Sequence, residues 1–311
     1  MKEIRATKSK LLGYKIRICM GDRKRNIMIL ITGASGQVGC AVIRALSKAG
    51  IGTKAFIHRD SSIEKVKEAG ATEVFIGDMS EEKDLREALH GVDTVYYICS
   101  AANPKEDEIG GQMLQIAKEM GNIYFVYHSV LHSVLQDMPH HKRKLHTEQL
   151  VVNSGLDFAV IQPAVFMQML MPAVKSVHSG GPMLQKFFTS NDTQMSFVDM
   201  EDFAEAVAVI LSSKDYANGT FELCGKGNYS LQDMEAVFSE VTSREVKSVY
   251  ITDEAFIGQM KIDKSSYQAQ TLLTMFRHYN EHSFRGNSFL LARILGREPH
   301  TLHQFVSRNM Q

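Results

Sequence analysis

The sequence predicts an α/β protein built on a doubly wound parallel sheet, followed by a smaller C-terminal α/β lobe. The first half alternates short apolar runs with amphipathic helical patterns, which is the order of elements in a parallel sheet covered by helices. These runs are almost continuously apolar, as expected of strands buried on both faces. With 311 residues and 44% apolar content, the chain is long enough for one large core or one core with a smaller lobe.

The first strand is expected over 27–31, and a glycine-rich turn joins it to a helical pattern that stops at Gly50. Strand, glycine turn and helix together favour a dinucleotide site, although the spacing is G-x-x-G-x-x-G rather than G-x-G-x-x-G. Amides freed by the glycines and the positive end of the helix form a cradle suited to a pyrophosphate. We expect the cofactor to contact Gly33, Ala34, Ser35, Gly36, Gln37, Val38 and Gly39.

The other elements of the first half follow in regular alternation. A capping box at 61–64 opens a short helix that ends at Gly70, and further helices are expected at 80–90, 106–120 and 144–153. This order indicates a Rossmann domain over 26–163, with ligands at the carboxyl ends of the strands where the strand order reverses. The remaining strands are expected at 52–58, 73–76, 94–99, 123–129 and 158–161.

Past Pro163 the pattern is weaker. Helical periods lie at 200–211, 230–241 and 265–279, and strand-like pieces lie at 195–198, 220–223 and 246–251. We expect 164–311 to form a substrate lobe packed on the Rossmann domain.

The first 25 residues contain nine lysines and arginines against two acidic residues. We expect a disordered leader or an upstream start codon. A transit peptide or a nucleic-acid-binding arm would have a similar composition.

Composition excludes several classes of protein. The chain carries 35 basic and 35 acidic residues, so it lacks the charge excess of a nucleic-acid-binding protein. No apolar run approaches the ~20 residues that span a bilayer, which predicts a soluble protein. Its cysteines are far apart and form no C-x-x-C pair, which indicates a reduced, cytoplasmic protein without disulfides. The 12 histidines show no metal-binding spacing, so no metal is expected.

The end of the second strand indicates the cofactor. An NAD site places Asp or Glu there, whereas this chain has His58 and then Arg59. The guanidinium suits a 2′-phosphate, so we expect NADP(H); the alternative for Arg59 is a solvent-facing residue. Asp78, after the third strand, is placed for a contact with the adenine edge, or else it simply shapes a turn.

Residues 27 to about 170 resemble an atypical short-chain dehydrogenase/reductase of the NmrA-like family, and the C-terminal segments extend the resemblance over most of the chain. It rests on residues 32–39, Arg59, Lys144-x-x-x-Glu148 ahead of 154–158, 162–167, 286–288 and 295–299.

This resemblance implies a catalytic group of Lys144, His140 and Ser129. Typical members of the wider family use Ser, Tyr and Lys, the last two as Tyr-x-x-x-Lys; here His140 stands in place of the tyrosine and Ser129 matches the serine. Lys144 would hold the nicotinamide ribose, and His140 or water would return the proton. The alternatives are an exposed lysine and a histidine in a solvated loop. Some tyrosine-lacking relatives reduce quinones, dyes or conjugated double bonds, and others only bind NADP(H) and report redox state to a partner protein.

The segment 165–171 follows the sixth strand, beside the expected nicotinamide position. Phe166 and Met167 would line a planar apolar substrate pocket, unless they belong to the core. We therefore expect an NADP(H)-dependent oxidoreductase that transfers a hydride to an apolar carbonyl, quinone or conjugated small molecule. The alternative is a non-catalytic NADP(H) sensor that regulates a protein partner.

Overall fold

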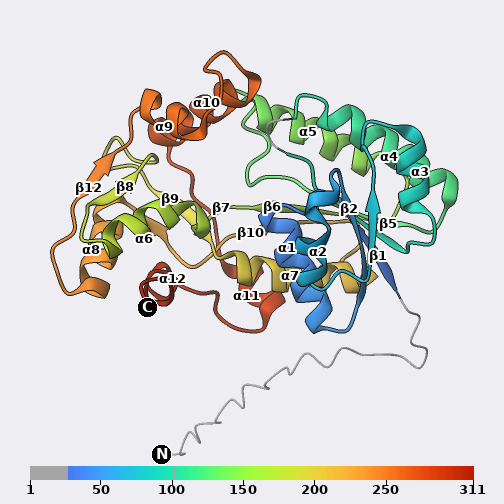
Figure 1. Ribbon diagram of the computed structural model, residues 1–311, viewed down its shortest axis with the longest axis horizontal. Coiled ribbons are helices and arrows are strands. Elements are labelled where there is room, and N and C mark those ends of the chain that lie inside the picture. The colour runs from blue at the N-terminus through green and yellow to red at the C-terminus, as the bar shows by residue number, and fades with distance from the viewer. Residues whose placement is uncertain (1–26, 101–102) are drawn as a thin grey trace, which may run out of the picture.

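A computed structural model describes residues 27–100 and 103–311. The predicted basic leader and Cys19 lie outside the described residues. The centre of the molecule is a seven-stranded sheet of order β10-β6-β5-β4-β1-β2-β3, parallel throughout and covered by helices on both faces (Figure 1). This arrangement confirms the predicted fold class. The strands are β1 Met28–Ile31, β2 Gly52–Ile57, β3 Glu73–Ile76, β4 Thr94–Tyr97, β5 Tyr124–His128, β6 Phe158–Pro163 and β10 Gly219–Leu223.

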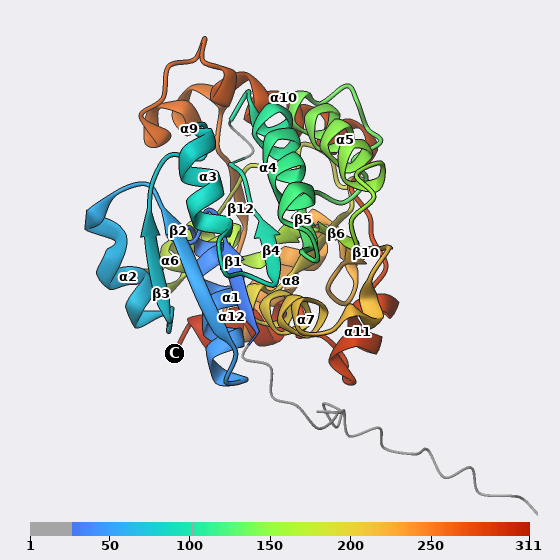
Figure 2. The same ribbon diagram turned by 90° about the vertical axis from the view of Figure 1, so that its right-hand side faces the viewer.

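The helices form two layers, one on each face of the sheet, as Figure 2 shows. Each layer encloses its own cluster of buried apolar side chains, which explains why the strands read as continuous apolar runs. One layer holds α1 Gln37–Lys48, α2 Ile63–Glu68, which follows the short helix η1 Asp60–Ser62, and α7 Met200–Ser212; the other holds α3 Glu82–Leu89, α4 Glu106–Met120 and α5 Pro139–Val152.

A smaller lobe follows β6 and lies at the left of Figure 1. It contains two small sheets, β11-β9-β7 and β12-β8. The chain then returns to the main sheet, because β10 pairs with β6 from Ala159 to Pro163. The elements of the smaller lobe are β7 Val165–Phe166, η2 Met167–Leu170, α6 Met171–His178, β8 Met183–Gln185, β9 Met195–Val198, β11 Asn228–Tyr229, α8 Leu231–Thr242, β12 Ser248–Tyr250, α9 Asp253–Met260 and α10 Tyr267–His282.

Two local predictions are wrong. The expected capping box at 61–64 is absent: Ser62 caps α2 without a side-chain hydrogen bond, because residues 60–62 form a 3₁₀ turn first. Helix α5 begins at Pro139, well before the predicted start. Proline suits the first turn of a helix, so His140 and His141 lie in a helical turn rather than in a solvated loop.

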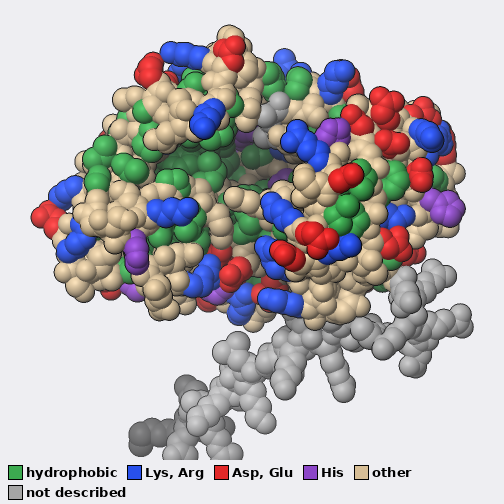
Figure 3. All heavy atoms as spheres, viewed as in Figure 1, with side chains coloured by type: hydrophobic (Ala, Val, Ile, Leu, Met, Phe, Trp, Pro, Cys, Tyr) green, Lys and Arg blue, Asp and Glu red, His purple; other side chains and the backbone are tan. Residues whose placement is uncertain are grey.

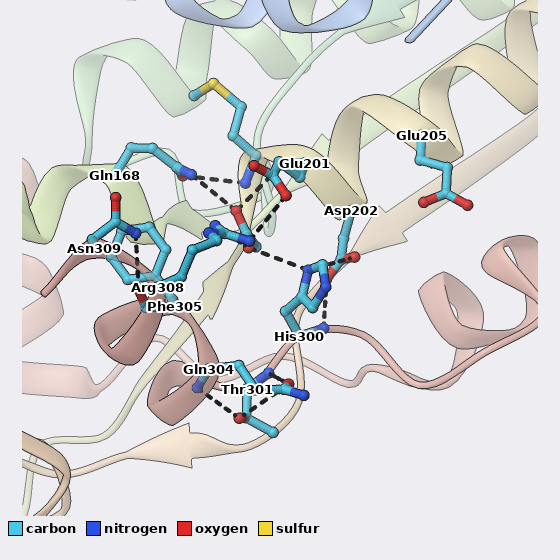
Figure 4. Close-up of polar contacts among 12 residues, drawn as sticks. Gln168, Glu201, Asp202, Glu205, His300, Thr301, Gln304, Phe305, Arg308 and Asn309 are labelled. Carbon is cyan, nitrogen blue, oxygen red and sulfur yellow. Dashed lines mark hydrogen bonds and ion pairs between the residues drawn. The ribbon is translucent and has the colours of Figure 1, made fainter. Parts of the chain in front are cut away.

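The last part of the chain is fastened to α7 by an ionic cluster (Figure 4). This last part of the chain contains α11 Phe289–Leu295 and α12 Leu302–Asn309. Helix α7 itself is followed by η3 Lys214–Tyr216 and then by β10. Asp199 and Asp202 are fully buried. Arg308 Nη2 lies 2.8 Å from Asp199 Oδ2. Arg297 Nη1 and His300 Nδ1 lie 2.8 and 3.0 Å from Asp202 Oδ1.

This cluster has residue types that could hold a cation, but the two arginines already neutralise both carboxylates. We therefore interpret it as an anchor for the C-terminal segment.

Two further properties bear on the predicted class. Within 27–100 and 103–311, no helix has the length and apolar content required to cross a bilayer. Cys40, Cys99 and Cys224 are buried free thiols.

Candidate functional site

Two positions where β1 leads into α1 favour glycine. Gly33 has a φ of +56°, a region that side chains disfavour. A Cβ on Gly39 would lie 2.6 Å from the carbonyl oxygen of Gly33 and 2.7 Å from the Cα of Ala34. Helix α1 therefore packs directly against the turn, and its first amides stay beside the end of β1.

The N-terminus of α1 is open to an anion. Gly36 is its N-cap and provides no side-chain cap, and no acidic residue lies in the first turn. Gly36 and Gln37 are exposed. Thr32 Oγ1 donates a 2.9 Å hydrogen bond to the carbonyl oxygen of Ile98 and ties β1 to β4, where the strand order reverses. Free amides and the helix dipole at a switch point fit the pyrophosphate of a dinucleotide.

His58, Arg59 and Asp78 lie at the ends of two neighbouring strands. His58 and Arg59 are exposed after β2, and Asp78 follows the adjacent β3. Asp78 Oδ1 accepts hydrogen bonds from the hydroxyl and the amide of Ser80, at 2.7 and 2.8 Å. These bonds, with a smaller effect of nearby His58, hold the pKa of Asp78 below its usual value. Turn geometry therefore accounts for one oxygen of Asp78, and its adenine contact stays a prediction.

Lys144 carries a buried ammonium group at the carboxyl ends of β4 and β5. Its Nζ donates to Glu106 Oε1 at 2.8 Å and to the carbonyl oxygen of His128 at 2.9 Å. Glu106, the first residue of α4, is also buried. Tyr127 Oη donates to the same Oε1 at 2.8 Å. The exposed-lysine alternative is therefore wrong, because Lys144 is 4% exposed and paired with a buried carboxylate.

His140 is buried one helical turn before Lys144. Its ring lies 4.4 Å from that of His141, and its Nδ1 has no hydrogen-bond partner within the described part of the chain. Burial, followed by the nearby His141 and Lys144, lowers the pKa of His140 to about 2. A histidine with this pKa is neutral at physiological pH, so it can form hydrogen bonds but cannot act as an imidazolium acid.

Two more neutral histidines accompany it. Burial lowers the pKa of His128 to about 3, and His128 Nδ1 lies 2.7 Å from Tyr96 Oη. Burial also lowers the pKa of His141 to about 4, and its Nδ1 lies 2.9 Å from the carbonyl oxygen of His132.

Ser129 is already engaged within the protein. It is buried after β5, and its hydroxyl donates to Glu148 of α5. Glu148 also accepts from Ser133 at 2.9 Å and from Gln162 Nε2 at 2.8 Å. The structure thus places Ser129 in a network centred on Glu148, which lies one turn after Lys144.

Both residues predicted to line the substrate pocket pack on the main core. Met167 is fully buried in the main core, so the core alternative applies to it. Phe166 is partly buried and packs edge-to-face on Phe203 at 5.0 Å.

Space for a ligand opens nearby. Figure 3 shows an apolar hollow between the lobe and the α1–α2 side of the molecule. A separate cavity of about 1260 Å³ runs along α1 and α7, and its lining includes Gln37, Met171 and Met200 but not Lys144, His140 or Phe166.

The sequence analysis gave no role to Glu106, nor to Glu148 and Gln162, although the last two lie in segments that carry the family resemblance. Glu148 had a signal, because its spacing of four residues places it on the same helix face as Lys144. Glu106 had none, because it lies 38 residues before Lys144 in another helix.

A parallel sheet, a glycine cradle at its switch point and a buried lysine at the adjoining strand ends define a dinucleotide-binding protein of the short-chain dehydrogenase/reductase class. The chain belongs to the NmrA-like family, whose model matches residues 25–308.

Known proteins of similar sequence and structure agree with this class. An NAD(P)H azoreductase of Xenophilus azovorans is 26% identical over 228 residues, which cover 73% of this chain and 78% of that protein. Quinone oxidoreductase 2 of Escherichia coli is 22% identical over 286 residues, covering 90% and 98%. A crystal structure of the NADPH-dependent quinone oxidoreductase of Escherichia coli with NADPH has a TM-score of 0.76 at 20% identity, covering 91% and 100%. These names bear out the expected class of activity and cofactor.

Proposed function

We propose that this chain is an NADP(H)-dependent reductase that transfers a hydride to a quinone, an azo dye or another apolar conjugated acceptor. The observation that carries the proposal is the position of Lys144. Its ammonium group is fixed at the carboxyl ends of β4 and β5, on the same sheet edge as the glycine cradle. Bound NADPH supplies the hydride, and the protein supplies binding, orientation and electrostatics.

The predicted cofactor-binding residues each have a task in this proposal. The amides of 33–39 hold the pyrophosphate, and Arg59 with His58 binds the 2′-phosphate. Asp78 keeps one carboxylate oxygen for the adenine edge. Lys144 has three N–H donors, of which two are used by Glu106 and His128, so the third serves the nicotinamide ribose.

Proton supply differs from that of a tyrosine-containing enzyme. His140 is neutral, and its role is to hydrogen-bond the acceptor and polarise it. The proton comes from water, because Ser129 already donates to Glu148. Such a site suits quinones and conjugated acceptors, whose reduction depends mainly on the orientation of the acceptor against the cofactor.

The test is NADPH oxidation at 340 nm with quinones, azo dyes and enones, using Lys144→Ala and Lys142→Ala. Lys142 is exposed on the same helix and serves as the control. We expect turnover of a quinone or dye to fall by about 100-fold in Lys144→Ala and to persist in Lys142→Ala. Equal activity of both variants would remove Lys144 from the site.

A second candidate is a non-catalytic NADP(H) sensor that acts on a protein partner. The neutral, buried His140 in place of the tyrosine favours it. Tight NADPH binding, measured by fluorescence, together with no turnover of any acceptor would support the sensor.

A further inference from the structure

We propose that Glu106 is the positioning residue of the site: it fixes the ammonium group of Lys144 in place for the cofactor. The inference rests on the proposed function of Lys144 at the nicotinamide ribose. Its basis is the shared oxygen Oε1 of Glu106, which accepts from Lys144 Nζ at 2.8 Å and from Tyr127 Oη at 2.8 Å.

The contacts leave Lys144 little freedom. Glu106 and the carbonyl oxygen of His128 direct two of its three N–H groups. The ring of Tyr127 lies 5.3 Å from Nζ and supports the cation from another side. With these three contacts fixed, the direction of the remaining N–H group is also fixed. Removing the Glu106 carboxylate would release that direction.

Glu106 is itself held rigidly. It is 1% exposed at the first turn of α4, where the helix dipole favours a negative charge. Its backbone carbonyl accepts a 2.7 Å hydrogen bond from Tyr97 Oη. The hydroxyl that meets Oε1 comes from Tyr127 on β5, so two neighbouring strands and a helix terminus all locate this carboxylate.

A purely structural role explains the pair poorly. Buried ion pairs contribute little net stability compared with apolar residues of similar size. Moreover, Oε2 of Glu106 is buried without a hydrogen-bond partner among the described residues, and an unsatisfied buried acceptor destabilises the fold. His128 and His140, which lie beside Lys144, are imidazoles and can supply no negative charge. Glu106 is therefore the one carboxylate bound to this ammonium in the part of the chain described.

The test is a double-mutant cycle with Glu106→Gln, Lys144→Met and the double variant. Glu108→Gln is the control, because Glu108 is exposed in the same helical turn. For each variant we would measure kcat and KM for a quinone, the NADPH Kd by fluorescence, and Tm. If Glu106 acts through Lys144, Glu106→Gln lowers kcat by about 100-fold, with little change in the quinone KM. The double variant is then no worse than Lys144→Met.

Independent, multiplying losses in the double variant would overturn the inference, because they would show that Glu106 does not act through Lys144. If Glu106→Gln fails to fold, Glu106→Asp replaces it, because aspartate keeps the charge but is one methylene shorter. We expect Glu106→Asp to lower kcat in the same way but by a smaller factor.

The NADPH Kd separates this inference from the proposed function. If the wild-type protein reduces no acceptor, the proposed function fails, yet the cycle can still be read from NADPH binding. Weaker binding in Glu106→Gln that is absent in the Lys144→Met background supports the positioning role. An NADPH affinity of Glu106→Gln equal to that of the wild type overturns it, whatever the turnover.

Discussion

Replacing Gly39 by alanine tests the geometry of the cradle directly. The new Cβ would lie 2.6 Å from the carbonyl oxygen of Gly33, whereas ordinary contacts begin at 3.4 Å. Both Gly39 and Ala34 are buried, so α1 has to move away from the turn. Overpacking of this kind costs about 1–3 kcal/mol of unfolding free energy, which lowers Tm by about 2–4 °C per kcal/mol.

Cofactor binding should suffer more than stability. The movement displaces the amides at the start of α1, and each lost hydrogen bond to a charged group costs about 1.5–3 kcal/mol. We therefore expect NADPH to bind about 10- to 100-fold more weakly. Fluorescence titration measures the affinity, and thermal unfolding measures the stability.

Gly111→Ala is the matched control. Gly111 lies within α4, and a Cβ there would meet only Leu150 at an ordinary 3.6 Å. Alanine in a helix interior stabilises by up to about 1 kcal/mol relative to glycine, so this variant should bind NADPH normally. If Gly39→Ala matches the wild type in both Tm and NADPH affinity, the close packing of α1 on the turn does not shape the site.

Two further predictions concern charge. Arg59→Glu should weaken NADPH by about 100-fold or more and NADH hardly at all, because a carboxylate repels the 2′-phosphate; equal weakening in titrations of both would exclude Arg59 from that site. In the unfolded chain His140 takes up a proton below about pH 6.5, whereas burial lowers its pKa in the folded protein to about 2. The free energy of unfolding therefore falls with decreasing pH by about 1.4 kcal/mol per pH unit for this residue. Urea unfolding between pH 6.5 and 4.5 should show that slope lost in His140→Gln and kept in the control His146→Gln, where His146 is exposed; an unchanged slope in His140→Gln would contradict neutral burial.

The parts of the fold that depend on neighbouring residues could be predicted from the sequence. Strand β1, the glycine turn and α1 lie within 28–48, and their apolar spacing and glycines act over a few residues. The start of α5 also had a local signal, because Pro139 lies in its first turn. The predicted start at Lys144 did not take this proline into account. The predicted cap at 61–64 was wrong because an intervening 3₁₀ turn is set by the path of the chain after β2.

Contacts between distant elements could not be predicted in the same way. The periodicity of 220–223 indicates a strand but not its partner, and β10 pairs with β6 in the main sheet. Likewise, Glu106 and Lys144 meet only because α4 and α5 pack together on one face of the sheet. The burial of His140 depends on the same packing.

Because β10 completes the sheet, the nucleotide-binding half is not a detachable module. A fragment that ends at Pro163 would keep β6 but lose its hydrogen-bonding partner from Ala159 onward. Its backbone N–H and C=O groups would then form a bare sheet edge, which promotes association between chains. Chimeras that exchange substrate lobes between relatives should therefore retain β10 with the sheet, grafting only the segments between β6 and α7 and those after β10.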